Sequence, residues 1–331
     1  MKSLFLLLAA PVLLAQSGQK FAELRNLRLE SGQTLAACRV GYRTYGKLNT
    51  AGTNAILWPT WFSGKTDQLE GFLGPGKMVD TGKFYVITVD ALGNGVSCSP
   101  SNTPGTFPAI TIKDMVDSEY RLLTEQLGVK SLHAVMGISM GGMQTFQWMV
   151  AYPGFVRRAV PIVGSAKLTS ADLLLWQAEL SAIEAVQKAG GDPRTAMPAV
   201  LAMHEFALST PQHEVNKTPA AGFPALLQTL QENARTGMDP RDWAAQLRAM
   251  MAHDVTKPFG GSMEKAGAAV HAKVLAVVAL QDHMVNPASA LQMAETAGFE
   301  VLRLTGDCGH GAPGCESAKM NAAVAEFLAR P

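Results

Sequence analysis

The 331-residue chain lacks an excess of either charge, with 28 Lys and Arg against 27 Asp and Glu and no basic run. Proteins that bind nucleic acids gather Lys and Arg on one surface, so we exclude nucleic acid as a partner. The sequence also lacks a long apolar run. No stretch reaches the about 20 residues that a helix needs to cross a bilayer, so we expect no membrane span. Internal repeats and low-complexity tracts are absent as well.

Cysteine is scarce, with four residues in the chain. No Cys-x-x-Cys or His-x-x-x-His spacing is present, so we expect no metal site and no cofactor. Cys308 and Cys315 are spaced to close a short disulfide around His310, whereas Cys38 and Cys98 lie far apart. The sequence leaves the pairing open. Disulfides persist in oxidising compartments, so four cysteines suit an exported protein.

The first residues have the pattern of a signal peptide, which we place at residues 1–17. Lys2 precedes an apolar run from Leu4 to Leu14, and Ala15-Gln16-Ser17 offers a small-x-small cleavage site. A buried N-terminal helix is the alternative, but Lys2 and the abrupt polar switch at Gln16 favour export. We therefore predict a periplasmic or secreted protein.

The remaining sequence predicts an α/β fold with a mostly parallel central sheet flanked by helices. Short, nearly continuous apolar runs alternate with helical stretches, as in strands that are buried on both faces. An earlier pair of runs, near Leu27–Glu30 and Leu35–Tyr45, predicts an antiparallel edge. A helix is expected over Ile112–Leu127, ended by Gly128. The expected parallel strands are Ala55–Trp58, Phe84–Val89, Leu132–Met136, Ala159–Val163, Val274–Leu280 and Phe299–Leu304.

Residues 166–267 differ from their surroundings, since they are rich in Ala, Leu, Met and Gln and poor in β-branched residues. About 100 residues exceed any ordinary connection between a helix and a strand. We interpret the segment as a helical cap inserted into a core formed by residues 18–165 and 268–331. Helices are expected from Ser170 towards Gly190 and over residues 196–208, 222–235 and 240–252.

A nucleophile motif, Gly137-Ile138-Ser139-Met140-Gly141, follows the strand that ends at Met136 and precedes a helix that we expect from Met143. A strand, a sharp turn and a helix are the context of the nucleophile elbow of α/β-hydrolases. The turn exposes the serine hydroxyl, and the small flanking residues let the strand and helix approach. We predict that Ser139 is a catalytic nucleophile.

A serine nucleophile needs a base, and His310 is the best of seven histidines. It lies in a glycine-flanked loop directly after the last predicted strand, which can return an imidazole over the sheet. The orienting acid should lie between nucleophile and base in the sequence, and Asp282, at the end of the preceding strand, fits this place. Asp307 is the rival, but three residues from His310 it is better suited to bracing the loop.

The oxyanion hole needs two backbone N–H donors. Met140, directly after the nucleophile, supplies one. The second is expected from Trp61 or Phe62, in the loop after an early strand, and the sequence does not choose between them.

The chain resembles the homoserine O-acetyltransferase family of α/β-hydrolases. The similarity rests on Tyr45-Gly46-Lys47-Leu48-Asn49, Gly74-Pro75-Gly76-Lys77, Ile110 to Val116 and Gly137 to Trp148. It implies a triad of Ser139, Asp282 and His310, a helical lid where the cap is expected, and often a dimer formed through that lid. In that family an acyl group passes from acyl-CoA to the serine and then to homoserine.

We predict a serine acyl-transfer enzyme that hydrolyses a small carboxylic ester through an acyl-Ser139 intermediate. Members of the family that acetylate homoserine usually carry Asp after the catalytic histidine, whereas this chain has Gly311. An exported enzyme also lacks access to acyl-CoA, which favours water as the acceptor. Homoserine O-acetyltransferase, acting on a thioester, is the alternative enzyme, and a catalytically silent binding module of the same fold is the non-enzymatic alternative.

Overall fold

The computed structural model describes residues 18–331, so the predicted signal peptide lies outside the described residues. An eight-stranded sheet forms the centre, with strand order β1-β2-β4-β3-β5-β6-β7-β8. The pairs β1–β2 and β2–β4 are antiparallel and the other five pairs are parallel, which confirms the predicted α/β fold. The strands are β1 Lys20–Arg28, β2 Thr34–Tyr45, β3 Ala55–Pro59, β4 Tyr85–Val89, β5 Ala134–Ile138, β6 Arg158–Ile162, β7 Lys273–Ala279 and β8 Glu300–Leu304.

Alternating side chains of the central strands pack into two separate cores, one on each face of the sheet. Leu57 of β3 faces the core formed with α1 (Ile112–Arg121) and α2 (Met140–Ala151), whereas its neighbours Ile56 and Trp58 face the core completed by α11 (Ser317–Ala329). A strand covered on both faces must be apolar throughout, which is why these strands are readable from the sequence.

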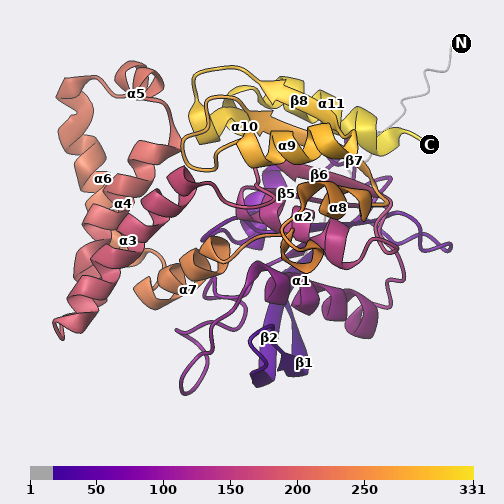
Figure 1. Cartoon of the computed structure of the whole chain (residues 1–331), viewed down its shortest axis with the longest axis horizontal. Helices are drawn as coiled ribbons and strands as arrows, with labels where there is room; N and C mark the ends of the chain where they lie inside the picture. Colours follow the sequence, from indigo (N-terminus) through magenta and orange to yellow (C-terminus); the bar gives the residue numbers. More distant parts are fainter. Residues whose placement is uncertain (1–17) are drawn as a thin grey trace, which may run out of the picture.

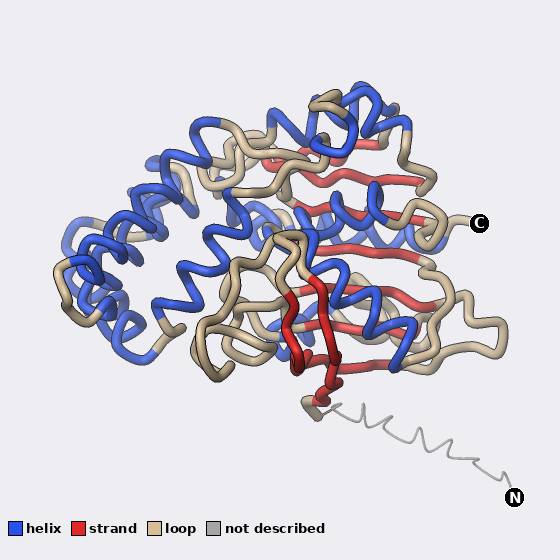
Figure 2. The backbone as a smooth tube through the Cα atoms, turned by 60° about the horizontal axis from the view of Figure 1, so that its bottom comes forward, coloured by secondary structure: helices blue, strands red, loops and turns tan. Residues whose placement is uncertain are grey.

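Between β6 and β7 the chain leaves the sheet and forms a series of helices. Figure 1 shows α3 to α6 standing to one side of the sheet, and Figure 2 shows the helices gathered at one end of the stacked strands. Here the cap means residues 166–267. Its helices are α3 Ser170–Lys188, α4 Met197–Leu208, α5 Pro211–Lys217, α6 Phe223–Thr236, α7 Pro240–Met251 and α8 Met263–Ala268. The last of these, α8, packs beside α9 (Ala288–Ala297), where Gly267 approaches Ala297.

Several elements differ from the expectations. Strand β1 begins at Lys20 and ends at Arg28, where the sequence predicted a strand near Leu27–Glu30. Helix α2 begins at Met140, directly after Ser139, and not at Met143. Helices α5, α8 and α9 were not predicted at all. No helix among residues 18–331 is both long and apolar enough to cross a bilayer.

Candidate active site

Ser139 occupies the turn between β5 and α2 with φ 58° and ψ −119°. A side chain at positive φ is strained, and such strain persists only where surrounding contacts impose it. The Ser139 N–H donates a 2.9 Å hydrogen bond to the Ile162 carbonyl of the neighbouring β6, which fixes the turn against the sheet. The geometry is that of the predicted elbow, with the hydroxyl presented above the end of β5.

Glycines around Ser139 provide the close approach that this turn needs. A Cβ on Gly137 would lie 2.3 Å from the Gly141 carbonyl oxygen, and a Cβ on Gly141 would lie 2.8 Å from that of Pro59. A Cβ on Gly142 would likewise lie 2.9 Å from the Cα of Gly164. Each neighbour is backbone and cannot move aside. The short Gly-x-Ser-x-Gly-Gly run is therefore required by packing at this site.

His310 lies directly over Ser139, although 171 residues separate them. Its Nε2 is 2.9 Å from the Ser139 Oγ. The histidine sits in a short 3₁₀ turn, Gly309–Gly311, which follows β8 and returns the imidazole to the carboxyl edge of the sheet. Both side chains are almost completely buried. This is hydrogen-bond distance for proton transfer from the hydroxyl to the ring.

Asp282 completes the constellation from the loop after β7. Its Oδ2 is 2.7 Å from the His310 Nδ1, while Oδ1 accepts hydrogen bonds from the N–H groups of Met284 and Val285 at 2.9 and 2.8 Å. The two backbone donors hold this oxygen in place and so fix the orientation of the carboxyl group. The other oxygen then accepts Nδ1–H, which leaves the lone pair of Nε2 to receive the Ser139 proton.

The three expected oxyanion donors lie around this serine. Met140 is the first residue of α2, where the N–H groups are unpaired and the helix dipole is positive. Trp61 and Phe62 follow β3, and both line the cavity in front of Ser139. Within the described part of the chain, none of these three N–H groups donates a hydrogen bond. The choice between Trp61 and Phe62 remains a prediction.

The other candidates are engaged elsewhere. Asp307 faces the cap, with Oδ1 3.2 Å from the His213 Nδ1, as expected for a residue that braces the loop. His283 is exposed. His133 and His253 each hydrogen-bond a backbone carbonyl through Nε2, and burial lowers the pKa of His253 to about 4. These two imidazoles serve the packing of the fold.

A cavity of about 250 Å³ opens above Ser139, called here the Ser139 cavity. Its walls come from the core and from the cap, and of the described residues that line it none is an Asp, Glu, Lys or Arg. Its polar groups are those of Ser139, His310 and His204, together with the indole N–H groups of Trp61 and Trp176, and the Trp176 Nε1–H has no partner within the described part of the chain. The apolar lining consists of Trp61, Phe62, Phe72, Ile138, Trp176, Leu208, Met250 and Met284.

His204 was missed by the sequence analysis, which placed it only within the cap. In the structure its Nδ1 lies 3.1 Å from Oε1 of Glu179, a fully buried carboxyl on α3. No motif links residues of α3 and α4, so no signal in one sequence would have paired them.

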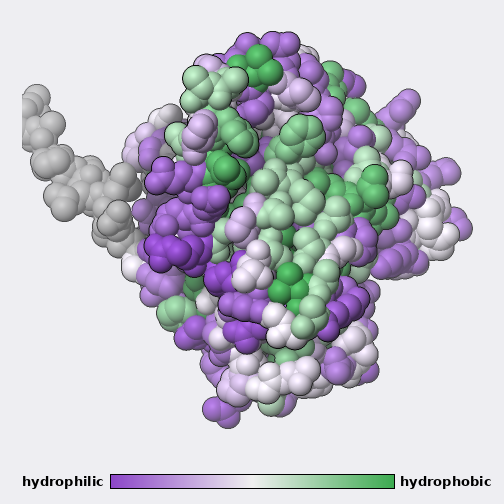
Figure 3. Space-filling model, turned by 90° about the vertical axis from the view of Figure 1, so that its left-hand side faces the viewer, coloured by the Kyte–Doolittle hydropathy of each residue, from purple (hydrophilic) through white to green (hydrophobic). Residues whose placement is uncertain are grey.

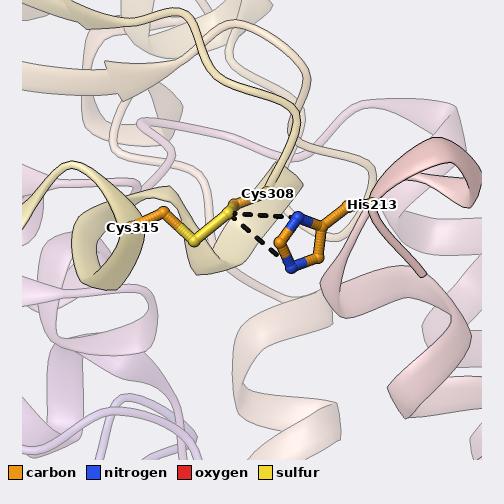
Figure 4. A group of neighbouring side chains, drawn as sticks. All are labelled: His213, Cys308 and Cys315. Atoms are coloured by element: carbon orange, nitrogen blue, oxygen red, sulfur yellow. Dashed lines mark hydrogen bonds between the residues drawn. A yellow bond between two sulfur atoms is a disulfide. The ribbon is translucent and has the colours of Figure 1, made fainter. Parts of the chain in front are cut away.

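The four cysteines form two disulfides. Cys38 and Cys98 join β2 to the loop after β4 with Cα atoms 5.3 Å apart, and Cys308 joins Cys315 with Cα atoms 6.5 Å apart. Figure 4 shows the ring of His213 beside the second bond, with Nδ1 3.4 Å from the Cys308 Sγ. These three side chains lie close enough to hold a metal, but the two sulfurs are bonded to each other and cannot act as thiolate ligands.

Comparison with known proteins agrees with the fold described above. The family model described as the alpha/beta hydrolase fold matches residues 76–313. An ethyl acetate hydrolase from Pseudomonas veronii is 31% identical over 92% of this chain and 94% of its own. The solved acetyl esterase MekB superposes with a TM-score of 0.87, at 28% identity, covering 95% of this chain and 97% of that one. A homoserine O-acetyltransferase from Bacillus anthracis gives a TM-score of 0.85, at 26% identity, covering 95% and 98%.

Proposed function

The chain belongs to the α/β-hydrolase family, and within that family we propose that it hydrolyses small carboxylic esters through an acyl-Ser139 intermediate. The observation that carries the proposal is the pair of short contacts from His310, at 2.9 Å to Ser139 and 2.7 Å to Asp282, at the floor of an apolar cavity. The similarity to an ethyl acetate hydrolase and an acetyl esterase supports it.

In the first half-reaction the Ser139 Oγ attacks the ester carbonyl while its proton passes to the His310 Nε2. The carbonyl oxygen becomes an oxyanion, which the Met140 N–H and that of Trp61 or Phe62 stabilise. The intermediate then collapses. The bond to the alkoxy oxygen breaks, Nε2 returns its proton to that oxygen, and the alcohol leaves an acyl-Ser139 ester.

In the second half-reaction a water replaces the alcohol. His310 accepts a proton from the water as its oxygen attacks the acyl carbon, and the same N–H groups stabilise the second oxyanion. Cleavage of the bond to Oγ returns the proton to Ser139 and releases the acid. Asp282 stabilises the imidazolium in both halves and holds the ring in one tautomer.

Transfer to homoserine is the second candidate, favoured by the similarity to a homoserine O-acetyltransferase. Homoserine carries an ammonium and a carboxylate, and burying either without a partner is costly. The described residues that line the Ser139 cavity include no side chain of opposite charge for either group. Gly311 stands where an acid would bind the ammonium. These observations favour water over homoserine.

Matched variants test the assignment with ethyl acetate and a chromogenic acetate ester as substrates. We expect Ser139→Ala to lower kcat by about 10⁴-fold or more, and Asp282→Asn by about 10³- to 10⁴-fold. His283→Ala, exposed and next to Asp282, is the control that should retain wild-type rates. Undiminished hydrolysis by Ser139→Ala would remove the nucleophile assignment.

A second assay separates the alternatives. Purified enzyme is given acetyl-CoA with and without homoserine, and free CoA is measured. Release that depends on homoserine and exceeds ester hydrolysis would establish the transferase. A protein that fails to react with a fluorophosphonate probe and hydrolyses neither substrate would be the silent binding module.

We further propose that two copies associate through the cap. Large apolar side chains are exposed on it, with exposed fractions of 75% for Leu174, 74% for Phe206, 69% for Val215 and 55% for Phe223. Figure 3 views this side and shows apolar surface between hydrophilic margins. Light scattering after gel filtration should give twice the monomer mass, and Phe206→Glu should give a monomer. A monomeric wild type at micromolar concentration would refute the dimer.

Export is also a proposal, supported by the signal-like residues 1–17 and by the two disulfides. Expression of the full chain in a bacterial host should yield a periplasmic or secreted protein that begins at Gly18, as measured by mass spectrometry. Recovery of only the uncleaved chain from the cytoplasm would contradict it.

A further inference from the structure

The cap contributes the imidazole of His204 to the lining of the Ser139 cavity, beside the indole of Trp176, whose Nε1–H can only donate. The His204 side chain is 18% exposed and projects from α4, which is part of the wall opposite the sheet. Ser139 and His310 already form a hydrogen bond with each other. His204 is therefore the side chain of the lining whose ring nitrogen can offer a hydrogen-bond acceptor to the rest of a substrate.

A buried carboxyl group selects the tautomer of this imidazole. Oε1 of Glu179 lies 3.1 Å from the His204 Nδ1, and Oε2 accepts a hydrogen bond from the Trp243 Nε1–H at 3.1 Å. Each carboxyl oxygen of Glu179 thus faces one ring nitrogen, and an oxygen acceptor at Nδ1 favours the tautomer with N–H at that position. In the neutral ring Nδ1 therefore carries the proton, and Nε2 is the hydrogen-bond acceptor.

Nε2 of His204 is unused by the protein. Among residues 18–331 it makes no hydrogen bond, whereas His133 and His253 both use Nε2 to bind a backbone carbonyl. Aromatic rings on either side restrain the imidazole, with centroids 5.6 Å away for Phe62 and 5.0 Å for Trp243. The ring is thus a preorganised acceptor, held in place before any ligand arrives.

We propose that His204 is a specificity-determining residue, which accepts a hydrogen bond from a hydroxyl group on the substrate. The preferred substrates are then small esters that carry a hydroxyl on the acyl or the alcohol part. This inference rests on the proposed ester hydrolysis and names its substrate class. The apolar walls can bind the carbon skeleton of a substrate but do not fix its orientation. A fixed acceptor favours esters that place a hydrogen-bond donor against it.

The test compares kcat/KM for esters that differ in one group. On the alcohol side the set is ethyl, 2-hydroxyethyl and 2-methoxyethyl acetate, and on the acyl side ethyl propanoate, ethyl 2-hydroxypropanoate and ethyl 2-methoxypropanoate. The methoxy compounds keep the oxygen but cannot donate. In the wild type we expect the hydroxy ester of one series to exceed its methoxy partner by about tenfold, the effect of one hydrogen bond in a dry site. In His204→Phe this ratio should fall to near one.

Glu179→Gln tests the positioning role. The Trp243 N–H should keep the amide oxygen on its side, so the amide NH₂ donates to Nδ1 and moves the ring proton to Nε2. Nε2 then donates, the methoxy ester becomes acceptable, and the hydroxy-to-methoxy ratio should fall several-fold. A merely structural role for Glu179 would lower all esters alike. Circular dichroism melting checks that both variants fold.

The outcomes separate the two proposals. A wild type that hydrolyses ethyl acetate with hydroxy-to-methoxy ratios near one in both series overturns the role of His204 and leaves ester hydrolysis intact. Ratios that stay unchanged in both variants overturn it as well. A wild type that hydrolyses none of the six esters overturns the proposed function itself.

Discussion

The Thr210 hydroxyl of the cap donates a 2.6 Å hydrogen bond to the backbone carbonyl of Asp307, three residues before His310. Gly309 lies in the same contact. Its φ is +60°, and a Cβ there would lie 3.0 Å from the Cα of Ser209. The loop that carries the proposed base is therefore packed directly onto the cap, so the position of His310 depends on the cap as well as on the sheet.

Thr210→Val should show this dependence. The change keeps the side-chain shape but removes the bond to Asp307 and the cap of α5, where Thr210 accepts the His213 N–H. We expect a loss of about 1–2 kcal/mol in stability and a fall of several-fold in kcat, as His310 becomes less well aligned. Thr111→Val, which removes the cap of α1 far from the loop, is the control. It should cost similar stability and leave kcat unchanged, and equal kcat in both variants would contradict the coupling.

The two disulfides should separate stability from activity. The Cys38–Cys98 bond spans 60 residues and the Cys308–Cys315 bond only 7. In the chain-entropy account, replacing each pair by serine costs about 4 kcal/mol for the long loop and about 2–3 kcal/mol for the short one. The loss of activity should be larger for the Cys308/Cys315 variant, because the short disulfide holds the loop that carries His310. Urea unfolding and ester hydrolysis of the two double variants measure both. A larger loss of kcat in the Cys38/Cys98 variant would refute the prediction that the short disulfide supports activity.

Much of the sheet was predictable, for a physical reason that also explains the misses. Strands such as β3 and β6 are buried on both faces and read as uninterrupted apolar runs, so the expected and observed bounds agree within a residue or two. The edge strand β1 buries only Ala22, Leu24 and Leu27, and most of its residues are polar and exposed. The apolar pattern of β1 in the sequence is therefore weak, and the predicted start of the strand was wrong.

The residues of the site also fall into a group that the sequence predicts and a group that it does not. Ser139, Asp282 and His310 each follow a strand at the carboxyl edge of the sheet, so chain order and local motif were enough to predict that they meet. His204, Glu179 and Trp243 come from three cap helices, and their contact depends on how those helices pack. Helix packing is set by many side chains together, which explains why the most informative polar group of the Ser139 cavity was absent from the sequence prediction.

Gly137→Ala should disrupt the elbow. The new Cβ would lie 2.3 Å from the Gly141 oxygen and 2.4 Å from its carbon, and both are backbone atoms. Strand β5 and helix α2 must then separate, which we expect to cost more than about 3 kcal/mol and to displace Ser139. Gly154→Ala meets nothing within 4 Å and is the matched control, with unchanged melting temperature and activity. A Gly137→Ala protein as stable and active as the control would show that the strand and helix do not need this contact.

Glu119 should make stability depend on pH in a direction opposite to that of an ion-paired carboxylate. It is buried under α2, where Oε2 accepts the Trp148 Nε1–H at 2.6 Å and Oε1 has no partner within the described part of the chain. Burial, with a smaller contribution from Asp117, raises the pKa of Glu119 from 4.5 to about 8. Between these two values the folded state keeps a proton that the unfolded state releases. The free energy of unfolding therefore falls as pH rises from about 4.5 to about 8.

Glu119→Gln removes this dependence, because the amide mimics the protonated acid and does not ionise. We expect the variant to be close to the wild type at pH 5 and more stable at pH 9, with a difference of a few kcal/mol, about 1.4 for each unit of retained pKa shift. Urea unfolding at the two pH values measures the difference. Glu125→Gln, at an exposed position paired with Arg121, is the control, and there the pKa is lowered by that partner, so its loss should not stabilise at pH 9. A difference between Glu119→Gln and the wild type that is the same at both pH values would mean that Glu119 is ionised in the folded protein at pH 5, and that water or movement of α2 relieves its burial.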